Sequence, residues 1–290
     1  MMINNISEEE RFSYFEEKFK GRVKFAGAQN PLIKHVTGLI NNTKPNPKKL
    51  FAVEGIWGLQ KALTYNLQIE TFAFAPECIH TNEAEEIITK LIEKSEDSYI
   101  LSKKVFLKLS EREGPDGLLA LCYLPQHDLS DIPLKENNLI VILDGLEIPG
   151  NIGTIIRSVD GVAADGVILC NRKARLTHPK LIKSSQGSNF TIPVIDEEYE
   201  NVIKYLKENN FKIFLTDTRA EKSYFEYDYK GRVALVAGSE RYGISRDWYK
   251  EQVNLVSIPM FGDCDSLNVA IATTIFLYEA SLKQKRILLR

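Results

Sequence analysis

Polar residues able to bind or orient a ligand occur in three loops of the second half of the chain. The first loop, LDGLEIPGNIGTIIRS, contains Asn151, and Arg157 follows six residues later. Asn151 is suited to cap a helix, because its side-chain oxygen can accept a hydrogen bond from a first-turn amide. Six residues turn a helix by about 600°, so the two side chains do not share a face, although both could flank one pocket at the helix start. Spacing alone leaves a cap and a solvated arginine as the alternative.

The second loop, VALVAGSERYGIS, follows an apolar run that predicts a strand. The strand leads into Gly238, Ser239 and Glu240, and Gly243 comes shortly after. This order predicts a tight strand-to-helix turn with exposed amides. An ordinary turn is the alternative, because a pair of glycines is weak evidence by itself.

The third loop, VSIPMFGDCDSLNVAIATT, joins a strand that ends at Pro259 to a helix rich in small residues. Ser266 and Asn268 stand directly before that helix. Small residues allow another part of the backbone to pack closely. The alternative is a simple capped helix, with Asp265 or Ser266 as the cap.

Other sequence motifs do not compete with these loops. The chain lacks the dinucleotide pattern GxGxxG, the phosphate loop GxxxxGK[ST] and the nucleophile elbow GxSxG. The cysteines and histidines are scattered and form no CxxC pair, so we expect neither a metal site nor disulfides, but reduced thiols. These residues are Cys78, Cys122, Cys170, Cys264, His35, His80, His127 and His178.

The elements that position the three loops alternate in type along the second half. Apolar stretches predict strands at 139–146, 166–170, 211–218, 232–240 and 253–260, and helical patterns lie at 151–164, 197–210 and 266–286. Buried strands alternating with helices indicate a parallel sheet covered on both faces. Ligands bind such sheets at the carboxyl ends of the strands, which is where the three loops fall.

The first half predicts a separate and smaller α/β unit. Residues 1–22 are polar and form a frayed or helical leader, and residues 23–128 carry mixed helical and strand patterns. The polar segment PQHDLSDIPLKENN contains two prolines and is the best linker, with a boundary near residue 130. The second domain is expected at 136–290.

Composition and charge limit the class of protein. A chain of 290 residues with 44% hydrophobic and 26% charged residues is typical of a soluble two-domain protein. The N-terminus lacks the layout of a signal peptide, and no apolar run is long enough to cross a membrane, so a cytoplasmic protein is expected. The net charge of −2 means that a nucleic-acid surface must be a local patch.

Basic residues gather in three short segments. KFKGRVK starts at Lys18 and KPNPKK at Lys44. The third, NRKARLTHPKLIK, provides the candidate RNA-binding residues Arg172, Lys173, Arg175, Lys180 and Lys183, together with His178. Each segment alone is more typical of a solvated face, but together they indicate charge asymmetry. Phosphate contacts by these residues would make RNA binding salt-dependent.

In order and spacing, the three loops closely resemble the signature motifs of the SpoU (TrmH-like) family in the SPOUT superfamily. The matching stretches are NIGTIIRSVDGVAADGVIL, LVAGSERYGIS and VSIPMFGDCDSLNVAIATTIFLYEA, and HPKLIKSSQGSNFTIPV resembles the family's connecting segment. The resemblance covers about residues 138–285. FAVEG and DGLLALCYLP resemble, less closely, a small RNA-binding domain similar to certain ribosomal proteins that many members carry.

The resemblance implies a fold and an activity that spacing could not reveal. Family members are S-adenosylmethionine-dependent RNA 2′-O-methyltransferases. Their C-terminal α/β domain has a mostly parallel sheet and a deep trefoil knot, a rare exception among folds. The knot forms the cofactor pocket, and members are usually homodimers with sites near the interface. We therefore expect this fold class, this cofactor, an RNA partner and a homodimer, without metal or membrane.

The resemblance also assigns roles to single residues. Asn151 and Arg157 match the first motif's asparagine and catalytic arginine, and Glu240 matches the acidic residue of the second motif. Ser266 and Asn268 match the polar pair of the third motif and are candidates for both catalysis and cofactor binding. The positions whose backbone holds the cofactor's adenine and ribose are matched by Gly238, Ile258 and Leu267. The stretch FGDCD is more acidic than is usual in this loop.

The chemistry leaves the role of Arg157 open. A ribose hydroxyl must lose its proton as it attacks a methyl group, yet the motifs contain no histidine or lysine to act as the base. Arginine normally stays charged, so Arg157 is either an unusual base or a clamp for a substrate phosphate. No metal is required, because the cofactor is already activated, and positioning can supply about 7–11 kcal/mol of the barrier reduction.

Several alternatives for the substrate and the activity stay open. Ribosomal RNA is the first expectation, because an auxiliary domain suits a large structured RNA, and transfer RNA is the second. A silent RNA-binding or ribosome-assembly factor on the same fold is argued against by the complete set of motif residues. A dehydrogenase is argued against by the missing GxGxxG. The sequence does not indicate which nucleotide is modified. It also does not distinguish a housekeeping role from one in antibiotic resistance.

Overall fold

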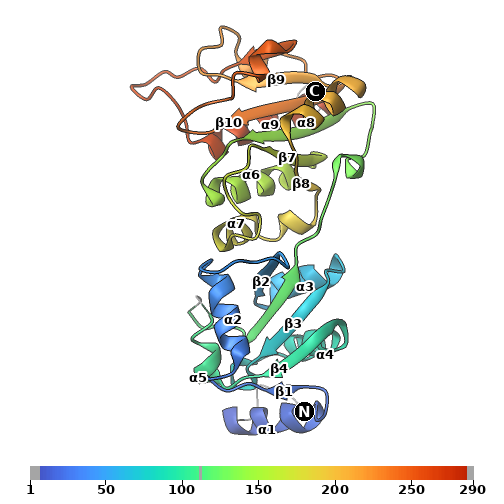
Figure 1. Cartoon of the computed structure of the whole chain (residues 1–290), viewed down its shortest axis with the longest axis vertical. Helices are drawn as coiled ribbons and strands as arrows, with labels where there is room; N and C mark the ends of the chain where they lie inside the picture. The colour runs from blue at the N-terminus through green and yellow to red at the C-terminus, as the bar shows by residue number, and fades with distance from the viewer. Residues whose placement is uncertain (1–6, 111–112, 286–290) are drawn as a thin grey trace. The chain divides into compact units, whose positions relative to one another are not determined.

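The computed structural model describes residues 7–110 and 113–285, which form two compact units, Met1–Pro125 and Gln126–Arg290 (Figure 1). No helix in this described part of the chain is long and apolar enough to cross a membrane. Each unit is described separately below.

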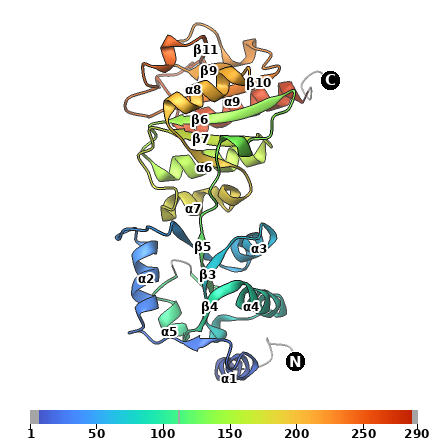
Figure 2. The same cartoon turned by 45° about the vertical axis from the view of Figure 1, so that its right-hand side comes forward.

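The first unit is a five-stranded mixed sheet with helices on both faces (Figure 2). The sheet order is β1-β4-β3-β5-β2, and β5 pairs antiparallel with both β2 and β3. Its helices are α1 (Glu8–Lys18), α2 (Pro31–Ile40), α3 (Ile56–Thr64), α4 (Asn82–Lys94) and α5 (Lys103–Phe106), with the 3-10 helix η2 (Pro76–Cys78). Its strands are β1 (Lys24–Phe25), β2 (Leu50–Glu54), β3 (Ile69–Phe74), β4 (Ser95–Ile100) and β5 (Leu118–Tyr123).

Helix α1, in the segment expected as a polar leader, belongs to the core of the first unit. A capping box formed by Ser7 and Glu10 starts the helix. Phe15 and Phe19 are fully buried, and both rings contact Phe74 of β3 edge to face. Burying rings of this size makes a major contribution to a small core. The helix therefore has a structural role that its acidic composition does not indicate.

The second unit is built on a six-stranded, entirely parallel sheet of order β11-β9-β10-β6-β7-β8. Its strands are β6 (Asn138–Asp144), β7 (Gly166–Cys170), β8 (Val194–Asp196), β9 (Lys212–Thr216), β10 (Arg232–Gly238) and β11 (Val253–Val256). Its helices are α6 (Pro149–Gly161), α7 (Pro179–Ser185), α8 (Tyr199–Glu208) and α9 (Val269–Gln284). The 3-10 helices are η3 (Leu129–Asp131), η4 (Ser188–Phe190), η5 (Tyr224–Glu226) and η6 (Trp248–Lys250). The predicted α/β class with a parallel sheet is confirmed.

Both faces of the second sheet are covered, because alternate strand residues point to opposite sides. On one face, Leu139 and Val141 of β6 pack with α6, α7 and α9. On the other, Ile140 and Ile142 pack with α8 and Trp248. All residues of β6 are buried, which explains why this strand reads as a continuous apolar run.

The starts of two helices differ from the predictions. Helix α6 begins at Pro149, two residues before Asn151, so the prediction that Asn151 caps it is wrong. Proline is favoured at the first helical position, because its ring fixes φ and its missing N–H would have no partner there. Helix α9 is capped by Asn268, which accepts from the amides of Ala270 and Ile271, and not by Asp265 or Ser266.

Between β7 and α8 the sequence patterns missed two short elements. Helix α7 and strand β8 both lie in this connection. A Cβ on Gly153 would overlap Leu181 and Ser184, so α6 and α7 pack with almost no space between them. These elements are too short to show a clear periodicity in sequence.

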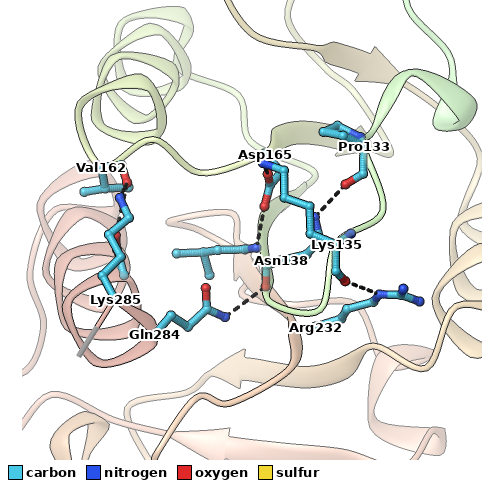
Figure 3. A network of polar contacts seen from close by, with 10 residues as sticks. Pro133, Lys135, Asn138, Val162, Asp165, Arg232, Gln284 and Lys285 are labelled. Atoms are coloured by element: carbon cyan, nitrogen blue, oxygen red, sulfur yellow. Dashed lines mark hydrogen bonds and ion pairs between the residues drawn. The ribbon is translucent and has the colours of Figure 1, made fainter.

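Figure 3 shows the polar contacts that close the amino end of β6. The buried Asn138 donates to the carbonyl oxygen of Pro133 and accepts from the amide of Lys135, both at 2.7 Å. Asp165 pairs with Lys135 Nζ at 2.6 Å and accepts from the amide of Leu139 at 2.8 Å. The segment that enters the second unit is therefore fixed to its sheet.

The carboxyl end of α9 is tied to the same region (Figure 3). Gln284 Nε2 lies 3.0 Å from the carbonyl oxygens of Asn138, Tyr229 and Gly231. Lys285 Nζ donates to the carbonyl oxygen of Val162 at 2.6 Å. These contacts fix α9 at the end opposite to Asn268.

Candidate active site

A cavity of about 420 Å³ opens at the carboxyl ends of β9, β10 and β11. Five of the predicted site residues line it, namely Gly238, Glu240, Ile258, Ser266 and Leu267. After β6, the strands β7 and β8 are added on one side of it, and the later strands β9, β10 and β11 lie on the other side. The direction in which strands are added therefore changes between β6 and β10. Ligand sites of parallel α/β sheets lie at such reversal points.

The turn after β10 forms one wall of the cavity. Ser239 and Gly243 exchange two backbone hydrogen bonds of 2.8 and 3.1 Å, and Ser239 Oγ accepts from the amides of Arg241 and Tyr242. The predicted tight turn is present, but the prediction of exposed amides is wrong for Ser239 and Gly243, whose amides are bonded within the turn, and no α-helix follows directly. Gly238 has no room for a side chain, because a Cβ would overlap the backbone of Gly243 and Ile244.

The segment that follows this turn is anchored by a buried carboxylate at the end of β6. Asp144 is 2% exposed. Its Oδ2 accepts from the amide of Ser245, and its Oδ1 accepts from Asn171 Nδ2, both at 2.7 Å. The turn is thus held to the sheet on both of its sides.

Polar side chains from all three motifs meet beside the cavity. Asn151 donates from Nδ2 to Glu240 Oε1 and accepts from Asn268 Nδ2 at 3.3 Å. Asn268 Oδ1 in turn accepts from the first amides of α9. Residues 89 and 117 positions away from Asn151 therefore share one hydrogen-bonded chain. We name Asn151, Glu240 and Asn268 the polar triad.

Arg157 lies outside both the cavity lining and the polar triad. Its side chain is exposed on α6, and within residues 7–110 and 113–285 it makes no hydrogen bond or ion pair. The neighbouring Ser158 hydroxyl bonds to Thr274 Oγ1 at 2.7 Å, which locks α6 against α9. Arg157 therefore projects from a rigid support and is available to a molecule from solvent.

Sequence analysis missed the wall of the cavity that follows β9. Asp217 lies there with its side chain 7% exposed, and it receives three hydrogen bonds from Arg219, two from the guanidinium and one from the backbone amide, and one of 2.7 Å from Tyr249. The Arg219 guanidinium lowers the pKa of Asp217 to about 2. Burial, and then the bond to Asp217, raises the pKa of Tyr249 to about 12. Asp217 stands at the carboxyl end of the strand predicted at 211–218, and this position was the available signal.

The predicted RNA-binding residues divide into two groups. Arg172 is engaged, since Nε pairs with Asp196 at 2.7 Å and Nη1 donates to the carbonyl oxygen of Ala174. His178 caps α7 by accepting from the amide of Lys180, and burial lowers its pKa, so it adds no charge at neutral pH. Lys173 and Lys180 are exposed, and so are Arg175 and Lys183, which also make contacts of their own.

Fold and cavity together define an α/β protein with a ligand site at the carboxyl ends of a parallel sheet. The model of the SpoU rRNA Methylase family matches residues 138–278, and that of the MRM3-like substrate binding domain matches residues 30–120. A 23S rRNA (uridine(2479)-2′-O)-methyltransferase of Streptomyces viridochromogenes is 33% identical over 236 residues, 79% of this chain and 78% of the relative. The chain belongs to the SpoU rRNA methylase family, which confirms the resemblance seen in its motifs.

Another relative and two solved structures agree with this assignment. A 23S rRNA (guanosine(2553)-2′-O)-methyltransferase of Bacillus subtilis is 30% identical over 180 residues, 62% of this chain and 71% of the relative. The AdoMet-bound rRNA methyltransferase of Sinorhizobium meliloti matches with a TM-score of 0.82 and 28% identity, covering 93% of this chain and all of that one. The SpoU methyltransferase AviRb of Streptomyces viridochromogenes, in complex with AdoMet, gives 0.79 and 27%, covering 89% and 99%.

Proposed function

We propose that this chain is an S-adenosylmethionine-dependent methyltransferase that modifies a ribose 2′-hydroxyl of ribosomal RNA. Two relatives, each matched by this chain over more than two thirds of its length, are named as 23S rRNA 2′-O-methyltransferases. This favours ribosomal over transfer RNA as the substrate. The observation that carries the proposal is the polar triad, because it joins one residue from each motif at the cavity.

The cavity fits the proposed cofactor in size and character. Its volume of about 420 Å³ lies within the usual range for small-molecule sites. Apolar walls from Val256, Ile258, Leu267 and Phe276 suit an adenine ring, and Gly238 lines the same cavity. We assign Gly238, Ile258 and Leu267 to the adenosine through their backbone groups, and Ser266 to its polar edge.

The polar triad has one internally consistent orientation. An ionised Glu240 can only accept hydrogen bonds, so the amide group of Asn151 must face it with nitrogen. The oxygen of Asn151 then faces the nitrogen of Asn268, and the oxygen of Asn268 faces the amides of α9. In our proposal these side chains shape the mouth of the cavity and position the ribose that enters.

Arg157 is the proposed catalytic residue at the RNA side of the mouth. When bound, the cofactor supplies an electrophilic methyl group on a sulfonium. The attacking ribose hydroxyl must lose its proton, and the exposed guanidinium of Arg157 either receives it or holds a phosphate that orients the hydroxyl. In both roles Arg157 acts on the RNA and not on the cofactor, in agreement with its place outside the cavity lining.

The RNA surface is proposed to include both units. The first unit matches a substrate-binding domain over residues 30–120. In the second unit, Lys173 and Lys180 are exposed lysines that can contact phosphates. A homodimer, a trefoil knot and a cytoplasmic location complete the proposal, and all three follow from family membership and from the nature of the substrate.

A tritium-transfer assay tests this function. Purified protein and labelled S-adenosylmethionine are incubated with unmodified 23S rRNA and with unmodified transfer RNA, beside the variant Arg157→Ala. We expect label in 23S rRNA as an alkali-stable 2′-O-methylated dinucleotide, and loss of at least 100-fold in the variant, whose cofactor affinity stays unchanged. Label in transfer RNA alone would show that transfer RNA, and not ribosomal RNA, is the substrate. Cofactor binding without methyl transfer to either RNA would favour a silent RNA-binding factor.

A further inference from the structure

Two aromatic side chains are exposed next to the cavity. Tyr242 is 70% exposed and Phe261 is 97% exposed. In the chain, Tyr242 directly precedes Gly243 and Phe261 directly follows Met260, and both neighbours line the cavity. Rings with this much surface in water add little to the packing of the unit, because stabilisation scales with apolar area removed from water. Their position at the rim therefore favours a role towards a ligand.

The turn after β10 holds Tyr242 in a defined place. Its amide donates to Ser239 Oγ at 3.1 Å, and the backbone pair of Ser239 and Gly243 closes the turn around it. Gly238 is packed directly against the next part of this turn. The ring of Tyr242 is thus presented by a rigid support two residues from Glu240, a member of the polar triad.

Arg241 completes a surface with the properties of a base-stacking platform. Its guanidinium lies over the ring of Tyr242, with Cζ 5.1 Å from the ring centroid. Such a cation–π pair leaves the remaining surface of the ring open and places a positive charge beside it. Proteins hold unpaired bases in this manner, by stacking on an aromatic ring while a nearby cation meets the phosphate.

We propose that Tyr242 and Phe261 stack on unpaired bases of the substrate RNA at the nucleotide that receives the methyl group and at its neighbour. The inference rests on the proposed function, since it concerns how that same site recognises RNA. Proteins that recognise RNA sequence mostly bind unpaired nucleotides, whose bases have left the helical stack and can stack on aromatic side chains. Stacking on the two rings replaces the stacking that the base loses.

The test measures methyl transfer to an unmodified 23S rRNA transcript at saturating S-adenosylmethionine. We expect kcat/KM for RNA to fall about 5- to 150-fold in Tyr242→Ala and in Phe261→Ala, the range found when one stacked base is lost. Tyr242→Phe keeps the ring and should stay within about twofold of the parent chain. Cofactor affinity, measured by calorimetry without RNA, should be unchanged in all three variants.

Phe225→Ala is the matched control in the same unit. Phe225 is 53% exposed, and its carbonyl oxygen accepts from Lys283, near the end of α9 that is remote from Asn268. It should leave kcat/KM unchanged. Full activity of both alanine variants, or an equal loss in Tyr242→Phe, would overturn the stacking role. A change of oligomeric state in Tyr242→Ala, seen by sedimentation, would overturn it in favour of a second copy as the occupant.

The failure of this inference can be told apart from failure of the proposed function. If the parent chain binds S-adenosylmethionine but methylates no RNA, the function itself is wrong. If the parent chain is active and the alanine variants are equally active, only the stacking role is wrong.

Discussion

Asn268 caps α9 and also donates a hydrogen bond of 3.3 Å to Asn151 Oδ1 on α6. One side chain thus starts the last helix and fixes the residue through which α6 meets Glu240. The cap determines which way the amide of Asn268 points, since the oxygen must face the helix amides. Stability of the helix start and orientation of the polar triad are therefore coupled in a single residue, and two substitutions can separate them.

Asn268→Ala removes both functions, whereas Asn268→Asp removes only the donor. The alanine variant should lose about 1 kcal/mol of stability through the missing cap, which for a unit of this size lowers Tm by roughly 2–4 °C. The aspartate variant keeps a cap, so its Tm should stay close to the parent value. Both variants should lose at least tenfold in kcat, because Asn151 is no longer held from this side.

Thermal unfolding followed by circular dichroism, with methyl transfer to 23S rRNA, measures the two effects separately. Equal activity of the aspartate variant and the parent would show that the bond between Asn268 and Asn151 does not matter for the reaction. If the alanine variant and the parent had the same Tm, Asn268 would not stabilise the start of α9 as a cap.

Gly238→Ala should destabilise the cavity wall by more than 2 kcal/mol. The added Cβ would overlap the backbone of Gly243 and Ile244, and backbone cannot move aside as a flexible side chain can. Gly262→Ala is the control, because a Cβ there meets nothing within 4 Å. Urea unfolding of both variants, together with cofactor titration, should show lower stability and weaker binding in Gly238→Ala alone. Unchanged stability of Gly238→Ala would mean that the turn can open.

The architecture of the second unit could be predicted because its strands are buried on both faces. The continuous apolar run of β6 is too short for a helix of ordinary length, and α8 repeats its apolar residues at helical spacing. Helix α7 and strand β8 were missed, because seven and three residues are too few to establish a period. The buried side chains of α1 were not recognised, because its exposed face is acidic and composition averages over both faces of a helix.

The motif residues could be found from the sequence, but their hydrogen-bond partners could not. Asn151 was expected to cap α6, but that helix starts at Pro149 without a side-chain cap. Helix α9 is capped by Asn268, where Asp265 or Ser266 was expected. Spacing along the chain says nothing of contacts between residues 89 and 117 positions apart, which only the topology brings together. The wall formed by Asp217, Arg219 and Tyr249 was missed for the same reason.

Asp217→Asn should reveal a stability contribution that depends on pH. The folded pKa of Asp217, about 2, lies below its ordinary value of 3.8, so the charged form stabilises the fold. The contribution is complete above about pH 5 and is lost as pH falls from about 4 towards 2. We expect a difference of about 1 kcal/mol at neutral pH, kept small because Arg219 is 82% exposed and screened by solvent.

Urea unfolding of the parent and of Asp217→Asn between pH 3 and pH 7 gives this difference directly. Asp247→Asn is the control, because its ion pair with Lys250 joins two exposed side chains and should contribute almost nothing. A stability difference that grows as pH falls would have the wrong sign for a carboxylate with a lowered pKa.

The exposed lysines near α7 should determine how RNA binding responds to salt. Lys173 and Lys180 carry exposed side chains in the predicted basic segment, whereas Lys204 on α8 lies near Glu208 at 3.9 Å. Each phosphate contact to structured RNA releases counterions and adds about 0.7–0.9 to the slope of log K against log salt. The double variant Lys173→Ala with Lys180→Ala should therefore lower the slope by about 1.5, and Lys204→Ala should leave it unchanged. Filter binding of a 23S rRNA transcript at several salt concentrations measures the slope, and equal slopes for the double variant and the parent would place the RNA on another face of this unit.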